Sequence, residues 1–225
     1  MCGRFAQRTP SKTLAREFQV DEMPDIEPRY NIAPTQDILS IRQSGEGREA
    51  AMLKWGLVPS WAKDVSIGAK LINARSETVT QKPSFREAFK KRRCIIPADG
   101  FYEWQRTGGK KQPFFFQMRD EHPFGFAGLW EKWKAVDGQV LETCTILTTE
   151  ANEVLRPVHD RMPVILHPED YDLWLDDEPR KLDLMIELLH PYPSSEMVLH
   201  PVSTAVNSTK NKGADLMSPL NVHLA

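Results

Sequence analysis

The sequence lacks the features that define several large classes of protein. It contains no stretch close to the ~20 apolar residues that a membrane-spanning helix needs, and its first residues lack the apolar core of a signal peptide. Internal repeats, low-complexity tracts and Gly/Ser linkers are also missing. We therefore expect one globular domain over residues 1–225 with no membrane partner, located in the cytoplasm, or at the nucleoid if it meets DNA.

Cysteine is scarce and the charges are balanced. The three cysteines, Cys2, Cys94 and Cys144, show no C-x-x-C spacing, so we expect no zinc site, no disulfide framework and no bound cofactor. Cys94 and Cys144 lie in apolar runs and are interpreted as buried, inert thiols. The net charge of -2 excludes a polycation that coats duplex DNA, although it permits a local basic groove.

Apolar runs bounded by turns predict a chain dominated by strands. A short helix capped by Ser11 is predicted over residues 11–18, and a second helix with a basic face over 84–92. Further helices are predicted at 168–175 and 179–189. The predicted strands are 37–43, 50–57, 93–98, 100–106, 112–118, 124–130, 141–149 and a late one near 197–203. Because turns rather than crossover helices join them, the predicted fold class is α+β with a mainly antiparallel sheet.

The opening residues, MCGRF, place a cysteine where it can become the N-terminus. A second residue as small as cysteine permits removal of Met1, after which Cys2 would carry both a free α-amine and a thiol. An α-amine with a pKa near ~7.7–8 is partly neutral at physiological pH and can form a Schiff base with an aldehyde. The thiol can then close a thiazolidine ring. Because a cysteine at position 2 is more often accidental, other residues must support this reading.

Three segments carry further candidate chemistry. Asn73 and Arg75 share one face if their segment is a strand and can hold a phosphate or sugar oxygen, and the alternative is a surface turn before a helix. Glu103 lies between two aromatic residues and is either an acid/base with a raised pKa or a solvated edge glutamate. His159 can move protons near neutral pH, with Arg161 available to a phosphate.

Basic runs are interleaved with tryptophans. The runs are KKRR, RTGGKK and STKNKG, and the tryptophans are Trp55, Trp61 and Trp104. A groove of cations and stacking aromatic rings would suit single-stranded nucleic acid, whereas charge runs are more often merely a solvated surface. The residues alone therefore predict an enzyme with a candidate N-terminal nucleophile.

Unusual motifs follow one another from residue 2 to about residue 213. They are MCGRF, PRYNIAPTQ, WGLVPSWAK, LINARSET, CIIPADGFYEWQ, PFFF, ILTTEAN, HDRMPVIL and HPVSTAVNSTKNKG. Together they resemble those of the SRAP family, the SOS-response-associated peptidases or abasic site processing proteins. The resemblance implies a single compact domain with a curved, largely antiparallel sheet flanked by short helices. It also implies a monomer that forms a thiazolidine crosslink with abasic sites in single-stranded DNA, including sites at junctions with duplex.

The resemblance implies a role for each matching catalytic position. Cys2 is the nucleophile, and Asn73 holds the opened sugar. Glu103 is the acid/base of ring opening and closure, and His159 moves protons in ring opening and in reversal of the crosslink. Met1 must leave first, either by autocatalysis or through methionine aminopeptidase.

The resemblance also implies contacts with DNA. The positions that match phosphate contacts of the family are Arg4, Arg75 and Arg161. The positions that match residues supporting or stacking splayed bases are Asn31, Pro34, Trp61 and Trp104. Two positions depart from some relatives: only Lys82 lies near the place of an additional arginine, and Ala62 replaces a second aromatic residue. Neither departure touches the chemistry, but both bear on DNA affinity.

Three alternative functions remain open at this point. A glutamine amidotransferase with an N-terminal cysteine also begins MCG, but its RGPD-like loop is absent here. A non-catalytic module for single strands or modified bases would bind without a crosslink, and replacing Cys2 would hardly change its affinity. A peptidase acting on other proteins would use Cys2 with His159.

Overall fold

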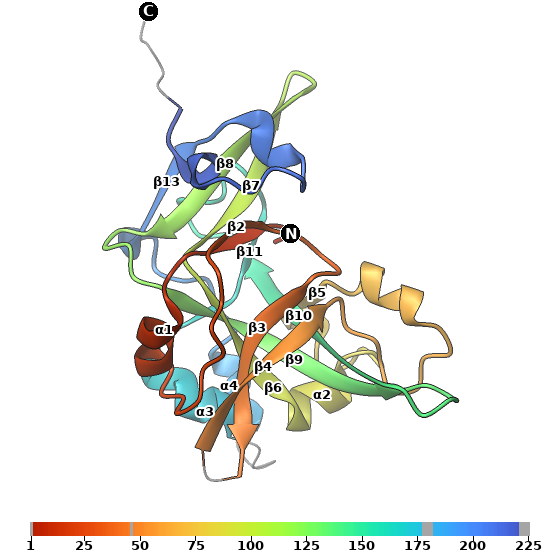
Figure 1. Ribbon diagram of the computed structural model, residues 1–225. Coiled ribbons are helices and arrows are strands. Elements are labelled where there is room, and N and C mark those ends of the chain that lie inside the picture. Colours follow the sequence, from red (N-terminus) through yellow and green to blue (C-terminus); the bar gives the residue numbers. More distant parts are fainter. Residues whose placement is uncertain (1, 46, 177–181, 221–225) are drawn as a thin grey trace, which may run out of the picture.

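A computed structural model describes residues 2–45, 47–176 and 182–220, and strands dominate it (Figure 1). The strands are β1 (Phe5–Gln7), β2 (Arg29–Ile32), β3 (Asp37–Ser44), β4 (Gly47–Trp55), β5 (Asn73–Arg75), β6 (Arg93–Ala98), β7 (Gly100–Thr107), β8 (Lys110–Met118), β9 (Phe124–Lys134), β10 (Val140–Glu150), β11 (Arg161–Pro163), β12 (Ile165–Leu166) and β13 (Met197–Pro201). The α-helices are α1 (Ser11–Glu17), α2 (Arg86–Lys91), α3 (Tyr171–Leu175) and α4 (Leu182–Glu187). Short 3₁₀ turns occupy Val65–Lys70, Ser76–Thr78, Pro168–Asp170, Ser194–Glu196, Thr204–Asn207 and Ala214–Met217.

The strands form two sheets, one of which closes on itself. The smaller sheet has the order β13-β8-β7-β1-β2, and all of its pairs are antiparallel. The larger sheet has the order β11-β10-β4-β3-β6-β9-β12, and a further pairing of β10 with β9 closes a barrel-like ring. Only the pairings of β10 with β4 and with β5 are parallel among the described strands. The predicted α+β class with a curved, mainly antiparallel sheet and short flanking helices is confirmed.

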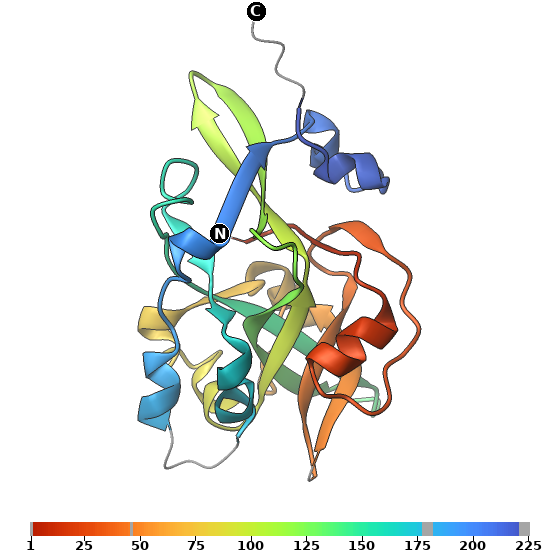
Figure 2. The same cartoon turned by 90° about the vertical axis from the view of Figure 1, so that its left-hand side faces the viewer.

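The β7–β8 hairpin rises above the barrel in both views (Figures 1 and 2). The predicted turn is present, and Gly108 and Gly109 occupy it with φ of 57° and 80°, which suits the tight turns that join twisted strands. Strand β1 pairs with β7 only at Gly100 and Phe101. From Glu103 onward, β7 therefore has no strand partner on its β1 side among the described residues.

The first strand is anchored by one aromatic side chain. Phe5 is fully buried, and its ring centroid lies 5.4 Å from that of Trp55 and 5.8 Å from that of Phe126, in edge-on arrangements. Edge-to-face pairs of this kind add stability beyond the burial of their apolar area. Because Phe5 is fixed in the core, the residues that precede it run beside β7, where the backbone N–H of Tyr102 donates to the carbonyl of Arg4 at 2.9 Å.

The longer predicted strands and helices are confirmed, with two qualifications. Ser11 is not the cap of α1: Pro10 occupies that position, and the hydroxyl of Ser11 instead accepts a hydrogen bond from the backbone N–H of Ile26 at 2.9 Å. The predicted helix 179–189 is described only from Leu182, so its first residues lie outside the described part of the chain. The short strands β1, β2, β11 and β12 gave no periodic signal and were not predicted, whereas β5 is the strand considered for Asn73 and Arg75.

Cys94 and Cys144 are buried and free, as predicted. Burial raises the pKa of both thiols above the usual range, so both remain protonated at neutral pH. Within the described residues, no helix combines the length and the apolar character that crossing a membrane requires.

Asp99 ties the end of β1 to the start of β7. Its buried carboxylate accepts hydrogen bonds from the backbone N–H groups of Arg8 and Thr9 and from the Thr9 hydroxyl. We predict that Asp99→Ala lowers the free energy of unfolding by about 2–3 kcal/mol, because buried donors lose their acceptor. Urea denaturation measures this loss. The matched control is Glu121→Gln, which removes an exposed partner of Arg8 and should change stability by less than about 0.5 kcal/mol. Equal effects of the two variants would contradict the prediction.

Candidate active site and nucleic-acid interface

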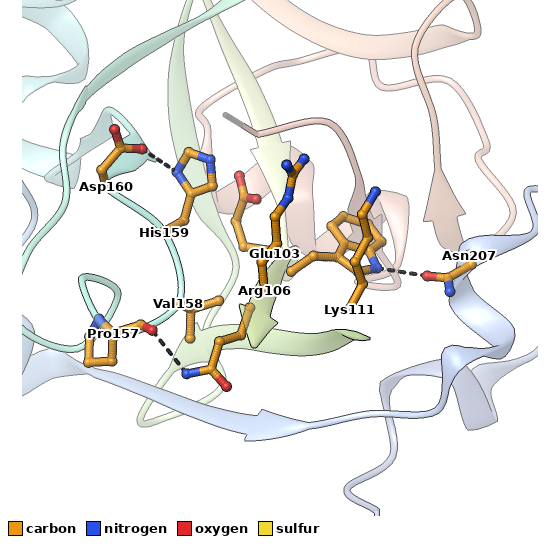
Figure 3. Close-up of a pocket in the computed structure, with 10 residues that line it drawn as sticks. Glu103, Arg106, Lys111, Pro157, Val158, His159, Asp160 and Asn207 are labelled. Atoms are coloured by element: carbon orange, nitrogen blue, oxygen red, sulfur yellow. Dashed lines mark hydrogen bonds and ion pairs between the residues drawn. The ribbon is translucent and has the colours of Figure 1, made fainter. Parts of the chain in front are cut away.

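A cleft of about 960 Å³ lies along the free edge of β7 (Figure 3). Two segments far apart in sequence form its walls, namely the β7–β8 hairpin and the loop that precedes β11. Its lining residues are Glu103, Trp104, Gln105, Arg106, Lys111, Pro157, Val158, His159, Asp160 and Asn207. The cleft therefore unites two of the sequence-predicted catalytic residues, Glu103 and His159.

The loop that carries His159 is held by its own hydrogen bonds. The side-chain oxygen of Asn152 accepts from the backbone N–H of Leu155, and the N–H of His159 donates to the carbonyl of Leu155. The backbone N–H of Ala151 donates to the carbonyl of Asp160 at 3.0 Å and so joins the two ends of the loop. Gln105 on β7 also donates to the carbonyl of Pro157 at 3.0 Å. The imidazole is thus presented to the cleft by a fixed loop.

Glu103 is a buried carboxyl, not the solvated edge residue of the alternative reading. The residue is only 4% exposed. Burial raises the pKa of its carboxyl to about 7, and the nearby charge of Asp160 acts in the same direction. At neutral pH both protonation states of Glu103 are therefore populated, which is the property that an acid/base catalyst needs.

His159 is neutral at physiological pH. Burial lowers the pKa of its imidazole below the usual value, while the carboxylate of Asp160, with Oδ1 3.0 Å from Nδ1, acts in the opposite direction (Figure 3). The backbone N–H of Arg161 donates to Nδ1 at 3.0 Å. This bond favours an unprotonated Nδ1, whereas the Asp160 carboxylate favours a proton on the same nitrogen.

Cys2 lies beneath the cleft in the main hydrophobic core. It has no exposed surface in the chain that carries Met1, and it belongs to the same buried cluster as Phe101, Ile146 and Val158. Burial raises the pKa of its thiol above the usual range, and the charge of Glu103 raises it further. The start of the chain runs beside β7, because the backbone N–H of Tyr102, next to Glu103, donates to the carbonyl of Arg4 at 2.9 Å. A reaction of the thiol therefore requires a group that removes its proton.

Asn73 offers an unused acceptor. It begins β5, pairs in register with Ile146 of β10, and its Nδ2 donates to the carbonyl of Ile146 at 3.4 Å. Its Oδ1 is buried and has no hydrogen-bond partner among the described residues. Because buried polar atoms are normally paired, this oxygen is suited to a ligand hydroxyl or N–H. The strand needed to place Asn73 and Arg75 on one face is present.

Two of the three predicted phosphate contacts are already engaged within the chain. Arg161 donates to both carboxylate oxygens of Glu77 and to the carbonyl of Thr148. Arg4 donates from Nη1 to Oδ1 of Asn31 and to a backbone carbonyl, both at 2.7 Å. Arg75 is exposed. A phosphate would have to share Arg4 and Arg161 with these partners, whereas Arg75 is accessible.

The predicted base contacts differ in exposure. Trp61 is 58% exposed, and Trp104 is half-buried with its Nε1 donating to Oδ1 of Asn207 at 2.7 Å. Asn31 is buried, and its amide donates to backbone carbonyls of residues 206, 208 and 211. Pro34 is half-buried and precedes Thr35, which has a φ of 70°. The expected stacking surface therefore rests on Trp61 and Trp104. The sequence analysis grouped Trp55 with these exposed rings, and that prediction is wrong because Trp55 is fully buried.

Several lining residues were not assigned to the site from sequence. Gln105, Arg106, Lys111 and Asn207 join it through the hairpin and the C-terminal turn. The sequence contains the basic run RTGGKK, but only the folded hairpin shows that Arg106 and Lys111 of this run line the same cleft as Glu103. Among the described residues, no three His, Cys, Asp or Glu side chains gather in a way that could hold a metal ion.

Known proteins resemble this chain over nearly its whole length. The family model of the SOS response associated peptidases (SRAP) matches residues 1–209. The chain is 45% identical over 221 residues to abasic site processing protein YoqW of Bacillus subtilis (strain 168), covering 96% of this chain and 99% of that protein. It is 35% identical over 227 residues to abasic site processing protein YedK of Escherichia coli (strain K12), covering 98% and 100%. A crystal structure of a protein from Bacteroides thetaiotaomicron matches with a TM-score of 0.85 at 25% identity, covering 97% and 99%.

The raised pKa of Glu103 predicts a pH-dependent effect of Glu103→Gln on stability. Between about pH 4.5 and 7 the folded carboxyl keeps a proton that the unfolded chain has released, so the original chain loses stability as pH rises through this window. The glutamine variant lacks this loss. Its stability relative to the original chain should rise by about 3 kcal/mol between pH 4 and pH 8. Urea denaturation at several pH values measures the difference, and a constant difference would contradict a raised pKa.

Proposed function

The chain belongs to the SOS response associated peptidase family, and we propose that it recognises abasic sites in single-stranded DNA and traps them covalently through Cys2 after Met1 has left. One observation carries the proposal. The start of the chain runs beside β7, where Tyr102 donates to the carbonyl of Arg4, and the neighbouring Glu103, whose pKa is about 7, lines a cleft together with His159. The relatives named abasic site processing proteins support the choice of lesion.

The trap uses both functional groups of an N-terminal cysteine. The ring-opened sugar of an abasic site carries an aldehyde at C1′. The free α-amine of Cys2 adds to this carbon and water leaves, which gives an imine. The sulfur then adds to the same carbon, and the proton of the thiol ends on the nitrogen. The product is a five-membered thiazolidine, and one water is released overall.

Glu103 supplies the proton transfers of both steps. In its protonated form it donates to the hydroxyl that leaves as water. In its ionised form it takes the proton of the Cys2 thiol, which the buried thiol would otherwise retain. A carboxyl with a pKa of about 7 can perform both tasks at neutral pH because neither form is rare.

His159 and Asn73 act on the sugar. The imidazole at the opposite wall of the cleft accepts and returns the proton that moves when the closed sugar opens to the aldehyde. The same group acts when the crosslink reverses. The unpartnered Oδ1 of Asn73 accepts a hydrogen bond from a hydroxyl of the opened sugar. These assignments give Glu103, His159 and Asn73 each a part in one reaction.

Removal of Met1 is the condition for the whole scheme. With Met1 in place, the amine of Cys2 is part of a peptide bond and cannot form an imine. The family name describes a peptidase, and we propose that this activity is limited to the Met1–Cys2 bond, with methionine aminopeptidase as the alternative agent. Capture as a ring also removes the iminium that drives β-elimination, so the DNA strand stays intact and the lesion is shielded.

DNA binding combines cations with exposed rings. Arg75 reaches phosphates directly, while Arg4 and Arg161 exchange or share their internal partners. Trp61 and Trp104 stack on bases next to the lesion, with Asn31 and Pro34 shaping the surface beside them. Because the net charge of the chain is -2, electrostatic attraction arises from this local group of cations and not from the whole molecule.

We predict that Cys2→Ser abolishes the durable adduct and leaves DNA binding intact. The serine variant retains an N-terminal amine but lacks the sulfur that closes the ring, so its imine hydrolyses or promotes strand cleavage. Intact mass spectrometry before and after incubation with a single-stranded oligonucleotide containing one abasic site measures the outcome. The original chain should lose Met1 and then gain the mass of the oligonucleotide minus one water. A heat-stable adduct of equal lifetime from Cys2→Ser would refute the ring mechanism.

Trp61→Ala should weaken binding to undamaged single-stranded DNA without destabilising the fold. Stacking of a base on an aromatic ring contributes about 1–3 kcal/mol, which corresponds to a loss of affinity of roughly 5- to 150-fold. The ring is 58% exposed, so the melting temperature should change little. Fluorescence anisotropy with a labelled oligonucleotide measures affinity. Trp61→Phe, which keeps a stacking surface, should recover most of it, and unchanged binding by Trp61→Ala would exclude stacking at this position.

A further inference from the structure

Two cations lie directly opposite each other on the β7–β8 hairpin. In the register of the hairpin Arg106 pairs with Lys111, so their side chains project from the same face as that of Trp104. Both line the cleft that contains Glu103 and His159, and both extend to the same side of the ribbon in Figure 3. Like charges at directly opposed positions destabilise a strand pair. This arrangement is therefore unfavourable for the hairpin by itself.

No acidic group within the described residues neutralises this pair. The ion pairs of the described chain include neither Arg106 nor Lys111, and neither side chain has a hydrogen-bond partner there. Both side chains are exposed. Arg42, by contrast, is paired with the carboxylates of Glu49 and Glu142. The hairpin thus presents two positive charges at one end of the cleft without an internal counter-ion.

We propose that Arg106 and Lys111 form a binding site for a phosphate of the DNA strand that flanks the lesion. The inference rests on the proposed function, since it extends the path of the same DNA strand along the free edge of β7. A guanidinium offers two parallel donors to a phosphate, and an ammonium adds a compact charge. Trp104 lies on the same face, and the guanidinium carbon of Arg4 lies 5.8 Å from the centroid of its ring. Cations therefore lie on both sides of a ring that can stack on a base.

The position of this site separates it from the reacting group. Arg106 is three residues beyond Glu103 on β7, which corresponds to about 10 Å along an extended strand. The charge of Arg106 nevertheless reaches His159, where it acts to lower the pKa of the imidazole. A phosphate held here would thus lie within the electrostatic range of the catalytic residues without taking part in bond formation.

The test compares two double variants with the same loss of charge. Arg106→Gln/Lys111→Gln removes the proposed site. Lys12→Gln/Arg16→Gln removes one exposed lysine and one exposed arginine from α1, which lies away from the hairpin in both views (Figures 1 and 2). Affinity for an undamaged single-stranded oligonucleotide is measured by anisotropy over a series of salt concentrations. Because undamaged DNA contains no aldehyde, this readout does not depend on the crosslink.

Arg106→Gln/Lys111→Gln, the hairpin variant, should bind roughly three- to tenfold more weakly at low salt. The slope of log K against log salt should decrease in magnitude by about 0.7–1.4, because one or two phosphate contacts are lost. The α1 variant should retain the slope of the original chain. Lys111→Glu changes the net charge by the same two units and should lower affinity to a similar extent, while its melting temperature stays level or rises because an opposite pair replaces a like pair. A purely structural role of Lys111 would instead lower the melting temperature.

The outcomes separate this proposal from the proposed function. If the hairpin variant matches the α1 variant in slope and affinity while the original chain still crosslinks to an abasic oligonucleotide, the phosphate site is wrong and the trap stands. If the slope decreases as expected but the original chain forms no adduct, the phosphate site is supported and the covalent trap is refuted.

Discussion

The packing of Phe5 against Trp55 and Phe126 is the constraint on which the rest of the site depends. An N-terminal reagent is useful only if the start of the chain is held in one place, and chain termini are usually poorly ordered unless they are tied down. Here the start of the chain is anchored by the side chain of Phe5, three residues after Cys2, which is buried in the core. The hydrogen bonds from Arg8 and Thr9 to Asp99 secure the other end of the same strand.

The shortness of β1 has a second consequence. Because this strand covers β7 only at Gly100 and Phe101, the remainder of β7 is left open on that side. An uncovered strand edge is usually a liability for aggregation, and charged residues are one means of protecting it. In this chain the open edge lines the cleft, and Glu103, Arg106 and the loop of His159 surround it. The same feature therefore opens the cleft and forms the surface along which we propose that a DNA strand runs.

Burial determines the protonation states of the three titratable groups. It raises the pKa of the Cys2 thiol and the Glu103 carboxyl, and it lowers the pKa of the His159 imidazole. In each case the neutral form gains, because removal from water penalises charge. The site thus holds a protonated thiol, a neutral imidazole and a carboxyl near its midpoint at neutral pH. Such a set transfers protons readily and avoids a persistent buried charge.

The sequence by itself determined the fold class, the longer strands and the catalytic candidates. Apolar and aromatic runs bounded by turns specify strands such as β7 and β8 locally, and motifs of unusual composition carry the family resemblance. Short strands such as β1 and β11 were beyond prediction because three residues give no period. Only the tertiary structure decided that Trp55 is buried, that Arg161 is bonded to Glu77, and that Arg106 faces the cleft. The physical reason is that burial, pairing and charge environment arise from contacts between segments, which no local pattern encodes.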